Sequence, residues 1–473
     1  MLQDYFSSRL AEGVAPARAQ AQGYVSRVLG LTIEARGIDV PVGHCCRIDL
    51  GGGEFCEAEA IAFDSDKTVL MPLRSVAAIP PRAAIVPLAR GERLPAGECL
   101  LGRVVDGVGR PIDGGAALAS GEQIGLHAPP INPLSRQPIS TPLDVGVRSL
   151  NAALTVGCGQ RVGLFAGSGV GKSVLLGMMA RFTEADVVVV ALVGERGREV
   201  REFVEENLAL VGRGKTVVVA APADETPLMR LRAGMYAARL SEDFSTRGKK
   251  TLLLFDSLTR YAQAQREIAL AAGEPPASKG YPPSVFAKLP QLVERAGGTV
   301  AGGGSVTAFY TVLAEGDDLS DPVADAARAV LDGHVVLSRD LADEGIYPAI
   351  DIPASVSRVM NNIVSVEHRR AADTLLQWSA RYQQNRDLVS VGAYTAGVDK
   401  VTDAALAAQP QIVRFLSQSR DQSVDFSASI EALLRLASPP ESEGVASAAP
   451  LATEAGELLS MPLAAAGASD VAR

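Results

Sequence analysis

The residues with the clearest chemical meaning form a glycine-rich stretch that is followed by a lysine and a serine. They are Gly167, Ser168, Gly169, Val170, Gly171, Lys172, Ser173 and Val174. In such a turn the backbone N–H groups point inward, and together with the positive end of the next helix they form a cradle for phosphate. The Lys172 ammonium can then reach the β- and γ-phosphates, and the Ser173 hydroxyl can coordinate Mg²⁺. The stretch predicts a relaxed P-loop for ATP with Mg²⁺ as its metal cofactor.

Two acidic residues follow other apolar runs and could complete a nucleotide site. Asp256 ends "LLLFD", where a carboxylate can hold the Mg²⁺ hydration shell opposite the P-loop. Glu195 follows "VVVVALVG" and could polarise the attacking water, with Arg196 beside it to stabilise charge. Taken alone, each has a plainer interpretation, as a strand-end aspartate or as the charged start of a helix.

Three further side chains are candidates for completing such a site. Arg358 lies in the mostly apolar segment "IPASVSRVM", where it is either a structural ion-pair partner or a finger that reaches the γ-phosphate of a neighbouring subunit. Tyr347 and Tyr394 could sandwich an adenine, although each tyrosine alone is more typical of core or surface.

The residues around these motifs alternate between strand-like and helix-like patterns. Near-continuous apolar runs are typical of strands buried on both faces of a parallel sheet. They occur at 161–166, 186–194, 215–222, 251–256, 306–313 and 334–338. The segment 173–182 after the P-loop has helical spacing. This alternation predicts an α/β core with a parallel sheet.

The pattern changes along the chain and predicts five regions. Residues 23–97 contain short β-rich pieces between glycine and proline turns, which suggests a small β-barrel. Residues 98–375 form the nucleotide-binding core, and 376–436 have a mostly helical pattern. Residues 437–473 are rich in Ala, Ser, Pro and Glu without periodicity, so we expect a disordered tail. Residues 1–22 form a short arm.

The arm carries Leu2, Phe6 and Leu10 at helical spacing, so it is either a frayed terminus or a helix that binds a partner. The formal net charge of −9 argues against a nucleic-acid partner. The five cysteines include no C-x-x-C pair, which favours reduced thiols rather than a metal site. Neither a signal peptide nor a membrane-spanning stretch is expected.

Several long stretches of the sequence resemble the F1/V-type ATPase superfamily and, more closely, the ATPases of type III protein export. The stretches "GERGREVREFVEEN", "YPPSVFAKLPQLVERAG" and "QNRDLVSVGAY" are most similar to the flagellar export ATPases. The resemblance extends over about residues 23–436. It departs from the family at Cys158, where an arginine is more usual, and in the longer tail.

The resemblance implies a β-barrel, a RecA-like P-loop ATPase core and a helical C-terminal domain, assembled as a homohexamer. It implies that Glu195 is the catalytic glutamate, Asp256 the aspartate on the Mg²⁺ side, Arg358 the finger, and Tyr347 and Tyr394 the adenine contacts. Implied partners are a stator-like negative regulator at the arm, a central stalk-like export protein, the export gate, and export substrates with their chaperones. The implied location is the cytoplasm, at the periphery of the inner membrane.

Other functions remain open at this point. An injectisome ATPase differs from a flagellar one only by degree. A rotary ATP synthase catalytic subunit would share the core motifs but not "GEPPASKGYPPSVFAKLP". A regulatory subunit should lack the catalytic carboxylate, and an RNA translocase should carry a basic, aromatic face.

Overall fold

The computed structural model describes residues 22–88, 93–118, 121–208, 214–298, 303–313 and 321–438. All but the last residue of the predicted arm and all but the first two residues of the predicted tail lie outside these ranges. Their predicted roles are therefore not addressed by the structure.

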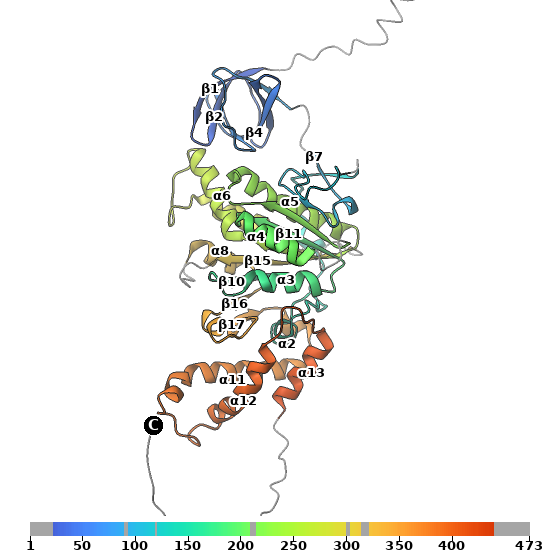
Figure 1. The fold of residues 1–473 in the computed structure, drawn as a ribbon, viewed down its shortest axis with the longest axis vertical. Helices are drawn as coiled ribbons and strands as arrows, with labels where there is room; N and C mark the ends of the chain where they lie inside the picture. Colours follow the sequence, from blue (N-terminus) through green and yellow to red (C-terminus); the bar gives the residue numbers. More distant parts are fainter. Residues whose placement is uncertain are drawn as a thin grey trace, which may run out of the picture. The chain divides into compact units, whose positions relative to one another are not determined.

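The N-terminal strands close into a barrel, as the sequence predicts (Figure 1). Neighbouring strands are antiparallel, in the order β1-β2-β5-β4-β3-β6. Alternate residues such as Ile33 and Ala35 point inward and are buried. The strands are β1 (Gly23–Leu29), β2 (Thr32–Arg36), β3 (Cys45–Gly51), β4 (Glu54–Asp64), β5 (Lys67–Pro72) and β6 (Ala84–Pro87).

A largely parallel sheet forms the core, in the order β17-β16-β10-β15-β13-β11-β12-β8, with β14 paired to β15. Only the pairings of β16 with β17 and of β14 with β15 are antiparallel. A separate pair joins β7 (Arg93–Pro95) to β9 (Gln123–Gly125). The sheet strands are β8 (Val104–Val105), β10 (Arg161–Ala166), β11 (Val187–Val193), β12 (Thr216–Ala221), β13 (Lys250–Asp256), β14 (Gly297–Gly298), β15 (Ser305–Leu313), β16 (Gly333–Leu337) and β17 (Ile350–Ser357).

Helices cover both faces of this sheet, which explains why its strands are apolar at every position. In β11, Val187 and Val189 pack into one buried cluster, while Val188 and Val190 pack into the other. Side chains alternate between the faces of a strand, so a strand covered on both sides has no polar face. The first cluster contains residues of α5 (Pro227–Thr246), α6 (Leu258–Ala271), α7 (Pro283–Val293) and α8 (Pro322–Val330); the second contains residues of α2 (Arg148–Ala153) and α3 (Lys172–Phe182).

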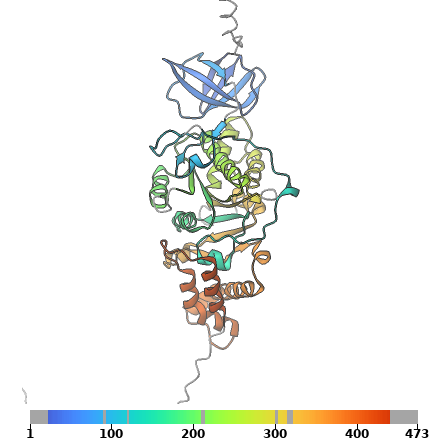
Figure 2. The same cartoon turned by 90° about the vertical axis from the view of Figure 1, so that its right-hand side faces the viewer.

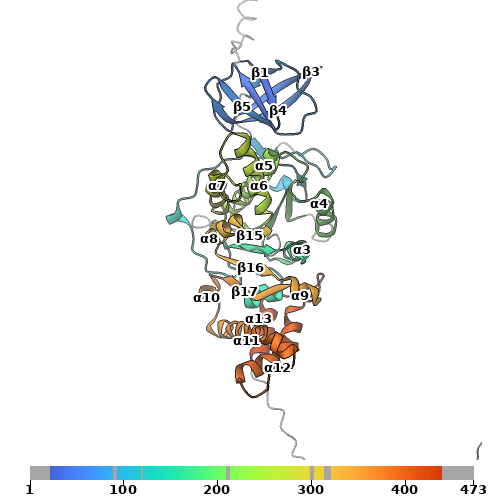
Figure 3. The same cartoon turned by 90° about the vertical axis from the view of Figure 1, so that its left-hand side faces the viewer.

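The C-terminal part of the described chain is helical (Figures 2 and 3). Its helices are α10 (Met360–Ile363), α11 (Val366–Ser390), α12 (Lys400–Leu416) and α13 (Phe426–Ala437). Ser365 caps α11 by accepting a hydrogen bond from the His368 N–H, so this helix begins inside the range 98–375 that the sequence assigns to the core. The parallel-sheet core between a barrel and a helical region confirms the predicted fold class. No described helix has the length and apolar composition needed to cross a bilayer.

Candidate nucleotide-binding and catalytic site

The predicted P-loop joins β10 to α3 at the carboxyl edge of the sheet. Gly169 and Gly171 have φ angles of 79° and 88°, a left-handed conformation that glycine adopts without a steric penalty. Val170 between them is buried in the core and anchors the loop. Lys172 and Ser173 then form the first turn of α3, so free N–H groups of the helix start face the same space as the loop.

A cavity of about 660 Å³ opens in front of this loop, a size typical of small-ligand sites. Of the residues predicted from the sequence, Gly167, Ser168, Gly169, Gly171, Lys172, Ser173, Val174, Glu195 and Arg196 line it. The structure therefore brings the P-loop and the glutamate–arginine pair together around one cavity.

Lys172 is the centre of a buried charge cluster. Its Nζ atom contacts Asp256 Oδ1 and lies 3.5 Å from Glu195 Oε1. Thr311 Oγ1 donates a hydrogen bond of 2.6 Å to the same Asp256 oxygen. The three charged side chains are only 5–11% exposed. Asp256 ends β13 and Glu195 follows β11, and these neighbouring parallel strands end at the same edge of the sheet.

The environment of Glu195 makes its carboxylate a weak acid. The pKa of Glu195 is raised to about 7. Burial is the main cause; the charge of Asp256 also raises the pKa, and this effect is larger than the lowering by Lys172. The Oε1 atom is buried and has no hydrogen-bond partner within the described part of the chain. For Lys172, burial would lower the pKa, but Asp256 and Glu195 outweigh it and the pKa is raised. The cluster thus pairs a fixed cation with a carboxylate that titrates near neutral pH.

The cavity is also lined by charged residues that the sequence motifs did not reveal. Arg230 donates to Glu267 at 2.8 Å, and Arg260 donates to Gln263 at 2.9 Å. The predicted Arg196 is largely exposed and lies 3.6 Å from a Glu199 oxygen. Arg260 could have been found from the sequence, because it lies in the first turn of the helix that follows Asp256 at the same sheet edge.

Tyr347 lies beside the P-loop. A Cβ atom added at Gly171 would be 3.4 Å from two ring carbons of Tyr347, and the Tyr347 carbonyl accepts a hydrogen bond from the Gln418 N–H at 2.8 Å. A second cavity of about 540 Å³ shares Ser173 and Val174 with the first and is also lined by Phe203 and Arg420, among others. An aromatic ring therefore stands next to the phosphate loop, and a further hollow continues from it.

Tyr394 and Arg358 are not brought to either cavity within one chain. Tyr394 lies between α11 and α12, and its hydroxyl donates to Asp403 Oδ1 at 2.8 Å. Arg358 follows β17 with its side chain exposed, and its guanidinium lies 3.5 Å from the Arg328 carbonyl oxygen. Neither residue lines the two hollows around the P-loop.

A parallel sheet with a P-loop and carboxylates at its carboxyl edge defines the class of P-loop nucleotide-binding proteins. Residues 146–357 match the ATP synthase alpha/beta family, nucleotide-binding domain, and residues 364–435 match the T3SS EscN ATPase C-terminal domain.

Individual relatives narrow the class further. The flagellum-specific ATP synthase of Pseudomonas aeruginosa is 59% identical over 426 residues, 89% of this chain and 94% of that protein. The assembled ATPase EscN of the enteropathogenic E. coli type III secretion system superimposes with a TM-score of 0.82 at 41% identity, over 88% of this chain and 100% of that one. EscN in complex with its central stalk EscO gives a TM-score of 0.79 at 40% identity, with the same coverage.

The chain belongs to the family of flagellum-specific ATP synthases and type III secretion ATPases, within the ATP synthase alpha/beta family. The resemblance seen in the sequence is confirmed, and the chain is an ATP-hydrolysing enzyme of this family.

Proposed function

We propose that this chain hydrolyses Mg²⁺-bound ATP at the P-loop cavity and thereby energises the export of flagellar proteins. The buried cluster of Lys172, Glu195 and Asp256 carries the catalytic part of the proposal, because it joins a phosphate-binding cation to a candidate base. The identity of 59% to a flagellar relative, against 45% to the type 3 secretion system ATPase of Xanthomonas euvesicatoria, favours flagellar export.

The phosphates of ATP fit the space in front of the P-loop. Lys172 is held there by two carboxylates, and a γ-phosphate would replace part of this pairing with a charge-assisted contact of its own. At Gly169, no atom of the described residues lies within 4 Å of the position that a Cβ would take, so the loop presents bare backbone to the cavity. The loop N–H groups and the start of α3 would bind the β-phosphate.

The residues present also fit Mg²⁺, which prefers oxygen ligands. Ser173 lines the cavity; Asp256 is not among its lining residues, but its carboxylate contacts Lys172, which lines the cavity, and accepts a hydrogen bond from Thr311. When bound, Mg²⁺ would neutralise charge on the β- and γ-phosphates. Ser173 would contact the ion directly, and Asp256 would hold its hydration shell.

Glu195 would orient the attacking water. Its side chain lines the cavity beside Lys172, and its pKa of about 7 suits a group that must accept a proton near neutral pH. Arg196, at the mouth of the cavity, would stabilise charge at the phosphates.

The remaining predicted residues support an active site that is completed at a subunit interface. Arg358 is exposed and does not reach the cavity of its own chain, as a finger acting on a neighbouring subunit requires. Because one chain carries both Glu195 and Arg358, a ring of identical subunits would complete every interface, and a homohexamer is proposed. Tyr347 would contact the adenine, while Tyr394 does not lie at the cavity and contributes no contact to this proposal.

The partners and location are proposed on the same family grounds. A central stalk-like export protein would bind the ring, which the complex of EscN with EscO supports. A stator-like negative regulator would bind residues 1–22, and the export gate, export substrates and chaperones would engage the assembled enzyme. It would work in the cytoplasm, at the periphery of the inner membrane.

The substitution Glu195→Gln tests the catalytic proposal. We expect turnover to fall by roughly 10²- to 10⁴-fold, because an amide cannot accept the proton, while ATP binding persists. Hydrolysis would be measured by phosphate release, and binding with a fluorescent nucleotide. Glu184→Gln is the matched control, since Glu184 pairs with Lys250 on the surface outside both cavities. Wild-type turnover in Glu195→Gln would contradict the assignment.

A further inference from the structure

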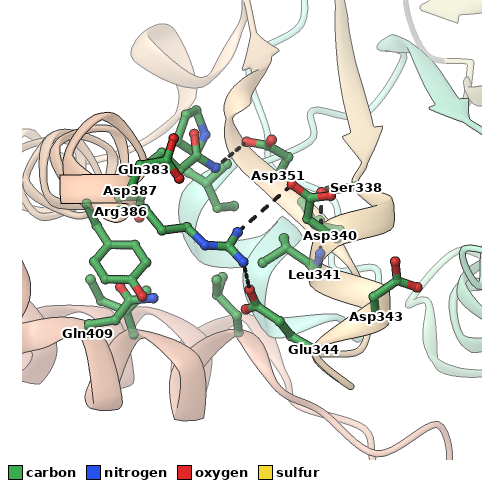
Figure 4. Close-up of a pocket in the computed structure, with 17 residues that line it drawn as sticks. Ser338, Asp340, Leu341, Asp343, Glu344, Asp351, Gln383, Arg386, Asp387 and Gln409 are labelled. Atoms are coloured by element: carbon green, nitrogen blue, oxygen red, sulfur yellow. Dashed lines mark hydrogen bonds and ion pairs between the residues drawn. The ribbon is translucent and has the colours of Figure 1, made fainter. Parts of the chain in front are cut away.

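A third hollow lies away from the P-loop, between the edge of the sheet and the C-terminal helices. This cleft has a volume of about 750 Å³ and is lined by residues of α9 (Arg339–Asp343), β17, α11 and α12 (Figure 4). Aliphatic side chains from α9, β17 and α12 line it: Leu341, Ile350, Ile352, Ile412 and Leu416. The cleft is large enough for a small organic ligand.

The charge of this cleft is strongly one-sided. Among the described residues that line it, the carboxylates are Asp340, Asp343, Glu344, Asp351 and Asp387, and the one cation is Arg386. Arg386 extends from α11 and lies 2.6 Å from Glu344 and 3.9 Å from Asp340 (Figure 4). The other three carboxylates have no ion-pair partner among the residues that the structure describes, so the cleft would repel anions and attract cations.

A buried hydroxyl in the wall gives an independent sign of a missing ligand. Ser379 on α11 lines the cleft and is only 8% exposed. Its Oγ atom has no hydrogen-bond partner in the described part of the chain. A helical serine commonly satisfies its hydroxyl on the carbonyl one turn earlier, and a buried hydroxyl without a partner is unfavourable. A donor that enters the cleft could satisfy Ser379.

We propose that the cleft binds an aliphatic polyamine, a flexible chain with several ammonium groups. Carboxylates on separate elements would each receive an ammonium group, and the apolar side chains between them would contact the methylene segments. A single metal ion fits less well, because no group of three or more metal-ligating side chains gathers in the described ranges. The bound ligand would bridge the sheet edge to the C-terminal helices.

Spermidine, added without nucleotide, tests this proposal independently of ATP hydrolysis. Trp378 is the only tryptophan of the chain and precedes Ser379 on α11, so its fluorescence reports on the wall of the cleft. Titration of the full-length protein at low ionic strength should give a saturable change in emission, and calorimetry should give the same midpoint.

Two pairs of variants, each a cleft residue with its control, locate the site. We expect Asp387→Asn to weaken spermidine binding about fivefold and Ser379→Ala about tenfold. The controls lie outside the cleft and should leave the midpoint unchanged: Asp373→Asn makes the same charge change on α11, and Ser149→Ala on α2 removes another buried helical hydroxyl that has no hydrogen-bond partner in the described part of the chain. Ser379→Ala should not lower the melting temperature, because it removes a hydroxyl that has no partner.

Several results would overturn the proposal. They are the absence of a saturable response, an equal loss in the control variants, and an equal response to MgCl₂ at matched charge, which would indicate general screening. Binding of a trilysine peptide without binding of spermidine would also overturn it, because the cleft would then recognise a protein segment.

Discussion

The two halves of the proposed active site differ in how much of them one chain supplies. Lys172, Glu195 and Asp256 are buried and touch one another, because neighbouring parallel strands deliver them to the same edge. Arg358 is exposed; its guanidinium lies 3.5 Å from the Arg328 carbonyl oxygen, and its backbone N–H donates to the Asp332 carbonyl. The fold of a single subunit therefore brings the phosphate-binding lysine and the candidate base together, whereas we propose that a further cation, Arg358, is supplied by a neighbouring subunit.

Removal of the Arg358 side chain should have the largest effect on turnover. We expect Arg358→Ala to lower turnover of the assembled protein by about 10³-fold, because the charge that stabilises the transition state is lost. Nucleotide affinity of the single chain should remain, since Arg358 does not line its cavity. Activity per subunit against protein concentration would be measured for both proteins, and the steep rise of the wild type should flatten in the variant.

A mixing experiment decides between a finger and a structural residue. Arg358→Ala and Glu195→Gln chains are each expected to be inactive, but mixed rings would place an intact Arg358 against an intact Glu195 at some interfaces. Recovered hydrolysis supports action in trans. If mixed rings form and remain inactive, or if Arg358→Ala lowers the melting temperature of the monomer, Arg358 is a structural residue.

The buried cluster of Lys172, Glu195 and Asp256 should make the rate of ATP hydrolysis depend on pH. Burial and Asp256 raise the pKa of Glu195 to about 7, so the ionised form that accepts a proton is lost as the pH falls through this value. We expect kcat/KM to fall about tenfold per pH unit below 7, because this ratio reports the pKa values of the free enzyme. Initial rates at low ATP from pH 5.5 to 8.5 would measure it.

The control for this profile is Arg358→Ala. A guanidinium stays protonated throughout this range, so the variant should be slower at every pH but keep the same midpoint. A midpoint near 4.5, the ordinary value for a glutamate, would show that the buried cluster does not set the titration.

The sequence could predict the features that depend on local patterns, but not the contacts that depend on the fold. The glycine spacing and the apolar runs are local signals, so the P-loop, the parallel sheet and the barrel could be predicted from them. Thr311 and Arg230 carry no local signal, because they reach the site through strand order and helix packing. Family likeness and residue type predict that Tyr394 contacts the adenine, whereas within one chain it lies on the connection between α11 and α12, hydrogen-bonded to Asp403.

The two tyrosines give the smallest expected effect and refine the comparison. Tyr347→Ala should weaken nucleotide binding about tenfold, because an aromatic ring that stacks on a base contributes roughly 1–3 kcal/mol. Tyr347→Phe should bind normally, since stacking needs the ring and not the hydroxyl. Tyr394→Ala should leave affinity unchanged and lose only the hydrogen bond to Asp403, a change of about 0.5–1.5 kcal/mol in the free energy of unfolding. Binding of a fluorescent nucleotide would be measured for the single chain and for the assembled protein. If Tyr394→Ala weakened binding only after assembly, Tyr394 would act across an interface. The neighbouring subunit would then supply a contact to the adenine as well as the Arg358 finger.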